Sequence, residues 1–185
     1  GLPEGRQGFD FAPAPSLNRP ATSHFSIVDA KGNAVAMTSS VENAFGSRLL
    51  VRGFLLNNQL TDFSFRLQRD GLPVANRVAA GKRPRSSMAP TMVFRGQNLV
   101  LALGSPGGSR IIGYVAKTII AVLDWKLDVQ SAVNLPHHVN RNGTTDLEEG
   151  TALAGLADGL KNLGHKVRMR SLNSGLHAIA LTPGG

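Results

Sequence analysis

Thr22 is the residue of this sequence whose position most clearly suggests chemistry. It opens the stretch Thr22 to Asp29, in which polar and apolar residues alternate, and a proline-rich run from Gly8 to Ala21 precedes it. The alternation predicts a β-strand, and the prolines predict an irregular leader. If the preceding peptide bond is cut, Thr22 becomes a chain terminus whose α-amine can act as general base for its own hydroxyl. A β-branched residue also favours a strand for packing reasons alone, so a purely structural interpretation stays open at this point.

A glycine-rich segment from Gly104 to Arg110 is a second candidate. It lies between an apolar strand-like run and a long apolar segment at 111–123. A turn of this kind presents backbone N–H groups, which suit an anion or the oxyanion of an acyl-transfer intermediate. The segment is not a P-loop, because the Gly-Lys-Ser/Thr ending is absent. Glycines that serve only close packing are the structural alternative.

Three other polar segments contain groups that could do chemistry. An apolar run ends in amides at 57–59, which can bind a ligand or simply cap a turn. The segment 81–88 is dense in hydrogen-bond donors. The adjacent His137 and His138 point apart on any regular element, and no carboxylate stands at ligand spacing, so no metal site is predicted.

Length and composition limit the class of protein. The chain has 185 residues, 42% of them hydrophobic, which is enough for one domain with a sizeable core. Its net charge of +8 suggests nucleic-acid binding as one possible function. However, only 5% of residues are aromatic and the basic residues are scattered, so we expect no nucleic-acid partner. An acidic partner subunit is the alternative explanation of the charge. No apolar run reaches membrane-spanning length, and the absence of cysteine excludes disulfides and thiolate metal sites. The chain begins without Met, which indicates a fragment whose targeting signal would lie elsewhere.

The elements that must position these groups follow the order strands, helices, strands. We expect hairpins over 22–40 and over 88–103, helices at 111–123, 127–135 and 151–163, and last strands at 167–170 and 176–181. Residues 66–81 show few signals of order and are expected to form a loop. There is no internal repeat. This order predicts an α+β fold of layered sheets and helices rather than a strict βαβ array.

Five blocks of the chain, in the same order, resemble the small, catalytic subunit of the gamma-glutamyltransferase (gamma-glutamyltranspeptidase) family. The blocks are Thr22 to Ser26 with Gly32 to Ala36, Leu55 to Gln59 with Asp62 to Ser64, Gly81 to Met88, Gly104 to Arg110, and the weaker Asn134 to Pro136. The resemblance covers Thr22 to about Pro183. It implies a fold similar to the N-terminal-nucleophile hydrolases, a four-layer αββα sandwich, of which this chain would be only the small-subunit part. A large subunit cut from the same precursor would complete it, and no metal or organic cofactor is implied.

The resemblance also implies catalytic roles. Thr22 would first cleave the Ala21–Thr22 bond of the precursor and then attack a gamma-glutamyl amide. Ser40 stands where the family usually has a threonine whose hydroxyl contacts the nucleophile. Gly107 and Gly108 would form the oxyanion hole, where the loss of one donor typically costs about 3 kcal/mol of barrier.

Five further residues would bind the substrate. Gln59 and Asp62 match residues that hold the substrate's α-amino group, and an ammonium does need such acceptors. Glu42 stands where many members have asparagine, and we keep it as a binding candidate. Ser86 and Ser87 match residues that bind the α-carboxylate, for which two hydroxyls are suitable donors.

On this interpretation residues 1–21 are the leader, the end of the large subunit, and residues 22–185 are the catalytic small subunit. The chain stops where the family continues, so a terminal strand is expected to be missing. The implied activity is hydrolysis or transfer of a gamma-glutamyl group from glutathione or a similar compound through an ester on Thr22, with water, an amine or a peptide as acceptor. An uncut Ala21–Thr22 bond would leave the site dormant, as in a zymogen.

Two alternatives stay open at this stage. The chain is also compatible with a related acylase, acting on cephalosporin side chains or on poly-gamma-glutamate, and with a non-catalytic domain that only binds a partner. Family habit suggests a periplasmic or extracellular location, and a cytoplasmic one stays open.

Overall fold

The computed structural model describes residues 22–182. The predictions for the leader at 1–21, for Ala21 and for the chain end therefore lie outside the described residues. In chain order, with η for a 3₁₀ helix, the elements are β1 (Thr22–Val28), β2 (Ala34–Ser40), β3 (Leu50–Val51), β4 (Phe54–Leu55), η1 (Gln59–Asp62), β5 (Gln68–Arg69), β6 (Leu72–Pro73), β7 (Thr91–Arg95), β8 (Asn98–Gly104), η2 (Gly108–Arg110), α1 (Ile111–Leu123), α2 (Val129–Asn134), β9 (His138–Asn140), β10 (Thr145–Glu148), η3 (Ala152–Leu156), α3 (Ala157–Asn162), β11 (Val167–Arg170) and β12 (His177–Ala180).

The predicted hairpin over 22–40 is confirmed as β1 and β2, which pair antiparallel. Its turn is held by Asp29, whose side chain accepts hydrogen bonds from the backbone N–H of Lys31 at 2.8 Å and of Asn33 at 2.9 Å. Side-chain bonds of this kind favour a turn over a continued strand. The register that follows places Thr22 directly opposite Ser40.

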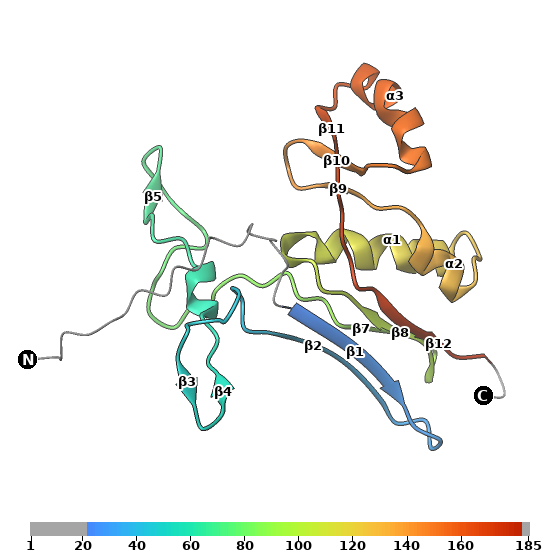
Figure 1. The fold of residues 1–185 in the computed structure, drawn as a ribbon, viewed down its shortest axis with the longest axis horizontal. Helices are drawn as coiled ribbons and strands as arrows, with labels where there is room; N and C mark the ends of the chain where they lie inside the picture. Colours follow the sequence, from blue (N-terminus) through green and yellow to red (C-terminus); the bar gives the residue numbers. More distant parts are fainter. Residues whose placement is uncertain (1–21, 183–185) are drawn as a thin grey trace, which may run out of the picture.

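A second layer is formed by β7, β8 and β12, in the order β12-β8-β7. The hairpin β1–β2 lies along this sheet (Figure 1). The two layers approach closely where the His24 ring packs on Gly104. A Cβ at residue 104 would lie 2.2 Å from that ring, so the absence of a side chain on Gly104 leaves the space that the ring fills. Strands β7 and β8 form the hairpin that was predicted over 88–103. Strand β7 starts at Thr91 rather than at residue 88, because Pro90 has no N–H to donate to a strand ladder.

Helix α1 covers the other face of the sheet (Figure 1). It has the predicted bounds, and its apolar stripe packs on β8, where Leu101 and Leu103 meet Ile111 and Val115 in the buried core. The result is a β-β-α stack of hairpin, sheet and helix. Within residues 22–182 no helix is long and apolar enough to cross a membrane.

The C-terminal third differs most from expectation. The single helix predicted over 151–163 is wrong: η3 and α3 divide the segment, and Gly155 and Gly159 within it weaken a continuous helix. The helix expected at 127–135 is shortened to α2, capped by Asp128 and followed by Pro136. A three-stranded sheet in the order β11-β10-β9 was not expected, because β9 and β10 are too short to show a clear alternation. The segment 66–81, expected as a loop, contains the two-residue strands β5 and β6.

Candidate active site

Thr22 and Ser40 begin and end the hairpin, and their side chains meet. The Thr22 hydroxyl donates a hydrogen bond to Ser40 Oγ at 3.0 Å, and the same oxygen accepts the backbone N–H of Glu42 at 2.9 Å. The cause is the antiparallel register, which brings the first residue of β1 opposite the last residue of β2. Ser40 is therefore positioned to orient the hydroxyl of Thr22.

A cavity of about 190 Å³ opens beside this pair. Eight of the nine residues that the sequence predicts in catalytic or binding roles line it, from five separate parts of the chain: Thr22, Ser40, Glu42, Gln59, Asp62, Ser86, Ser87 and Gly108. Four lining residues were not predicted as site residues, namely Arg85, Met88, Ser109 and Ile111. The residues that sequence reasoning grouped by chemistry are thus neighbours in space.

One part of the cavity wall is acidic. The amide of Gln59 donates to Glu42 Oε2 at 3.4 Å and also to the carboxylate of Asp62. The η1 turn places Gln59 and Asp62 three residues apart on one side. Burial raises the pKa of the Glu42 carboxyl, and the nearby Asp62 carboxylate raises it further. Two carboxylates around one amide make this wall an acceptor site for a cation such as an ammonium.

The segment 85–88 forms a wall rich in donors. Its path is set by Asn76, whose side-chain oxygen accepts the backbone N–H of Arg85 at 3.0 Å. The hydroxyl of Ser86 accepts the N–H of Met88 at 3.2 Å. A guanidinium beside hydroxyls is a natural partner for a carboxylate. Arg85 lies inside the block Gly81 to Met88 that resembles the family. Its position there, together with its positive charge, is the signal from which it could have been predicted as a site residue.

The glycine-rich turn reaches the cavity through its second half. Gly108 and Ser109 line the cavity, but Gly107 does not. Gly107 is buried at φ 142°, a conformation that favours glycine, and a Cβ there would lie 2.9 Å from Cε2 of Tyr114. Gly107 thus lies against the Tyr114 ring, which leaves no room for a side chain at residue 107.

His137 and His138 lie in different surroundings. The His137 ring is 5% exposed, with Nδ1 3.0 Å from Lys117 Nζ and Nε2 2.7 Å from Ser174 Oγ. Burial lowers the pKa of Lys117 to about 8, and burial with the neighbouring Lys117 lowers the pKa of His137 to about 4. His138 is exposed on β9. In the part of the chain that the structure describes, no three His, Asp or Glu side chains gather as a metal site would need.

The stacked sheets, the covering helix and a threonine hydroxyl at the first residue of a strand define the class. The fold is α+β and is the small-subunit part of an N-terminal-nucleophile hydrolase, as its structural neighbours show. Residues 7–185 match the family model of gamma-glutamyltranspeptidase. The chain belongs to the gamma-glutamyltranspeptidase family.

Several relatives and solved structures agree with this assignment. The chain is 38% identical over 149 residues to the glutathione hydrolase proenzyme of Bacillus subtilis (strain 168), covering 78% of this chain and 24% of that protein. It is 37% identical over 179 residues to the glutathione hydrolase proenzyme of Escherichia coli (strain K12), and the match covers 89% of this chain and 30% of that protein. It is 34% identical to an acylase proenzyme of Pseudomonas sp. (strain SE83), and that match covers 89% of this chain and 29% of the acylase. A crystal structure of Helicobacter pylori gamma-glutamyltranspeptidase superimposes with a TM-score of 0.78 at 34% identity, covering 86% of this chain and 91% of that one. The chain thus spans about a quarter to a third of the curated relatives' length.

Proposed function

We propose that this chain is the catalytic part of an enzyme that hydrolyses or transfers gamma-glutamyl groups, with Thr22 as the nucleophile. One observation supports this above all. The Thr22 hydroxyl faces a cavity that has carboxylates on one part of its wall and Arg85 with two serines on another. The gamma-glutamyl end of a substrate has an α-ammonium and an α-carboxylate, which these two groups complement. The Gly107–Gly108 turn is proposed as the oxyanion hole, with Gly108 at the cavity wall.

The proposed reaction begins with hydrolysis of the Ala21–Thr22 bond, in which water supplies the new carboxylate of Ala21 and the α-amine of Thr22 is freed. The Thr22 oxygen then attacks the carbonyl carbon of the gamma-amide, and its proton passes to that amine. The tetrahedral intermediate collapses, the C–N bond breaks, and the amine returns the proton to the departing nitrogen. Water, an amine or a peptide next attacks the carbonyl carbon of the gamma-glutamyl ester and gives up a proton to the amine of Thr22. The ester C–O bond breaks, and the amine passes this proton to the Thr22 oxygen, which regains its hydroxyl.

The hairpin supports the proposal that a large subunit completes the protein. Two cross-strand pairs, Phe25 with Met37 and Ile27 with Val35, place four large apolar side chains on one face of β1–β2. All four are exposed, Ile27 by 55%. A contiguous apolar face of this kind is typical of a surface that another layer covers. We assign that layer to the large subunit of the same precursor, with residues 1–21 as its end.

Mass spectrometry and turnover of the complete protein test the proposal. The wild type should show a new N-terminus at Thr22 and should release the amine from a chromogenic gamma-glutamyl anilide. Thr22→Ala should lose both cleavage and turnover. Thr144→Ala is the matched control, because Thr144 is an exposed threonine between β9 and β10 and does not line the cavity, and it should retain both. Normal turnover by Thr22→Ala would refute the mechanism.

The similarity to an acylase proenzyme supports a second candidate, an acylase of the same mechanism that acts on another side chain. The acidic wall separates the two. A gamma-glutamyl enzyme should lose most of its kcat/KM when the substrate's α-amino group is acetylated, because Asp62 and Glu42 then lose their cationic partner. An acylase for uncharged or dicarboxylic side chains should be indifferent to that change.

A further inference from the structure

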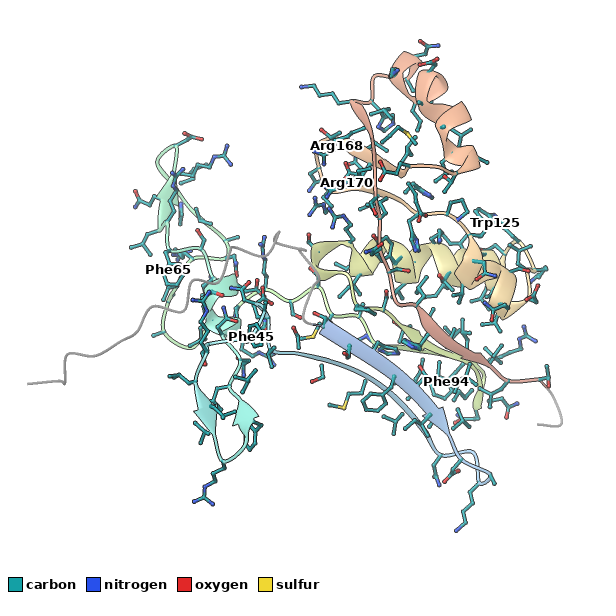
Figure 2. The ribbon with its side chains drawn as sticks, in the orientation of Figure 1. Phe45, Phe65, Phe94, Trp125, Arg168 and Arg170 are labelled. Carbon is teal, nitrogen blue, oxygen red and sulfur yellow. The ribbon has the colours of Figure 1, made fainter. Side chains whose placement is uncertain are left out.

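Several arginines gather beside the η2 turn but outside the lining of the polar cavity. Arg110 is the last residue of η2, and Arg141 follows β9. Arg141 Nη1 donates to Ser109 Oγ at 2.5 Å, which attaches the segment after β9 to the turn. Arg168 and Arg170 come from β11, whose side chains lie above α1 (Figure 2). We call Arg110, Arg141, Arg168 and Arg170 the arginine cluster.

Asp146 supplies the negative charge that pairs with this cluster among the described residues. The Asp146 carboxylate is 2% exposed and lies 2.7 Å from Arg168 Nη2 and 3.7 Å from Arg170 Nη1. It is thus shared by two guanidinium groups. Arg110 and Arg141 have no ion pair within residues 22–182. The cluster therefore holds more positive charge than its described neighbours offset.

Arg110 shows the imbalance most clearly. Its guanidinium makes no hydrogen bond to the described residues, and its Nε atom is buried without an acceptor, as is the Nε of Arg170. Burial and the positive charges of Arg170 and Arg141 lower the pKa of Arg110, although Tyr114 and Asp146 act in the opposite sense. A partly buried cation beside two others is unfavourable unless a counter-charge is present.

We propose that Arg110, Arg141 and Arg170 form a binding site for an oxyanion, either a carboxylate or a phosphate. Guanidinium groups recognise such anions by paired N–H donors, and three of them around one anion would offset their mutual repulsion. The anion can be a dissolved one or a carboxylate from the part of the protein outside this chain. Through Arg141 and Ser109 the site also supports the turn that lines the cavity, and it stands independently of the reaction proposed above.

Thermal unfolding of the complete protein tests the site. Inorganic phosphate is titrated at constant ionic strength against chloride, for the wild type, Arg110→Gln and Arg141→Gln. Arg69→Gln is the matched control, because Arg69 lies on β5 with its side chain 76% exposed. Ser109→Ala is a second control, since it removes the hydrogen bond from Arg141 and leaves the guanidinium in place.

Two results support the site and identify the source of the anion. For a dissolved anion, phosphate should raise the Tm of the wild type and of Arg69→Gln by about 2 °C or more, saturably, and both cluster variants should lose that rise. For a carboxylate of the protein, phosphate should have no specific effect, and both cluster variants should have a lower Tm than either control.

The opposite sign overturns the proposal. If no anion binds, removing one guanidinium relieves repulsion, and the Tm of Arg110→Gln and Arg141→Gln should equal or exceed that of the wild type. A Tm loss in Arg141→Gln no larger than in Ser109→Ala, with no phosphate response, also overturns it. So does a phosphate response that is the same in all variants.

Discussion

Tyr114 offers a sharp test of how the glycine-rich turn at Gly107 and Gly108, the proposed oxyanion hole, is supported. Its ring is 1% exposed, lies with its centroid 4.1 Å from that of His137, and packs against Gly107. Its hydroxyl, however, is buried and has no hydrogen-bond partner among the described residues. Burial raises the pKa of Tyr114, which keeps this hydroxyl neutral. The ring should therefore stabilise the protein, whereas the hydroxyl should not.

The two parts of the side chain can be removed separately. Tyr114→Phe keeps the ring and removes a desolvated hydroxyl whose burial costs about 1–3 kcal/mol when it is unpaired, so we expect unchanged stability or a gain of up to about 1 kcal/mol. Tyr114→Ala leaves a cavity behind the turn and should cost about 3–5 kcal/mol, as for a buried Phe→Ala change. Because Gly107 and Gly108 then lose their support, kcat should fall about tenfold or more with little change in KM.

Urea unfolding and turnover of a gamma-glutamyl anilide by the complete protein measure these effects. Tyr114→Leu, which fills part of the space, is a fallback if Tyr114→Ala does not fold, and should lie between the other two. The reasoning is refuted if Tyr114→Phe loses more than about 1 kcal/mol, which would mean that its hydroxyl is paired. It is equally refuted if the Ala variant folds and has the kcat of the wild type.

Three other predictions concern packing and pH. Gly104→Ala should lose roughly 1–3 kcal/mol in urea unfolding, because the new Cβ would lie 2.2 Å from the His24 ring. Glu42→Gln should raise Tm at neutral pH. Because the pKa of Glu42 is raised in the folded protein, the wild type loses stability as pH rises from about 4.5 through the folded-state pKa, and a neutral glutamine avoids this loss. The same variant should raise KM for a donor with a free α-amino group. Burial lowers the pKa of His137 from 6.5 to about 4, so the unfolded state takes up a proton first and stability should fall by roughly 3 kcal/mol as pH drops across that window. His137→Gln should lose this dependence, and a wild-type unfolding midpoint that is flat between pH 7 and 4 would contradict it.

Local patterns predicted most of the elements well. The bounds of α1 and β11 and the turn of the first hairpin agree with the structure, because each is set by neighbouring residues: an apolar stripe, a strand alternation and the bonds of Asp29. The prediction of one helix over 151–163 was wrong because it relied on the helical spacing of the leucines alone. The glycines in the same segment disfavour a continuous helix.

The candidate site was predicted in its parts rather than in its geometry. Thr22 and Ser40 could be paired from the sequence, since a hairpin's register follows from its turn. The contribution of Arg85 and the position of Gly107 behind the cavity wall could not, because both depend on contacts between distant segments. Asn76 sets the path of Arg85, and Tyr114 covers Gly107.

By itself, the sequence determined the kinds of groups available, the hairpin that joins Thr22 to Ser40, and the family to which the chain belongs. Only the tertiary structure decided which groups share one cavity and which cations crowd together. The arginine cluster shows the difference. Its members come from η2, from the segment after β9 and from β11, so their repulsion exists only once these elements pack together, and no local pattern in the chain records it.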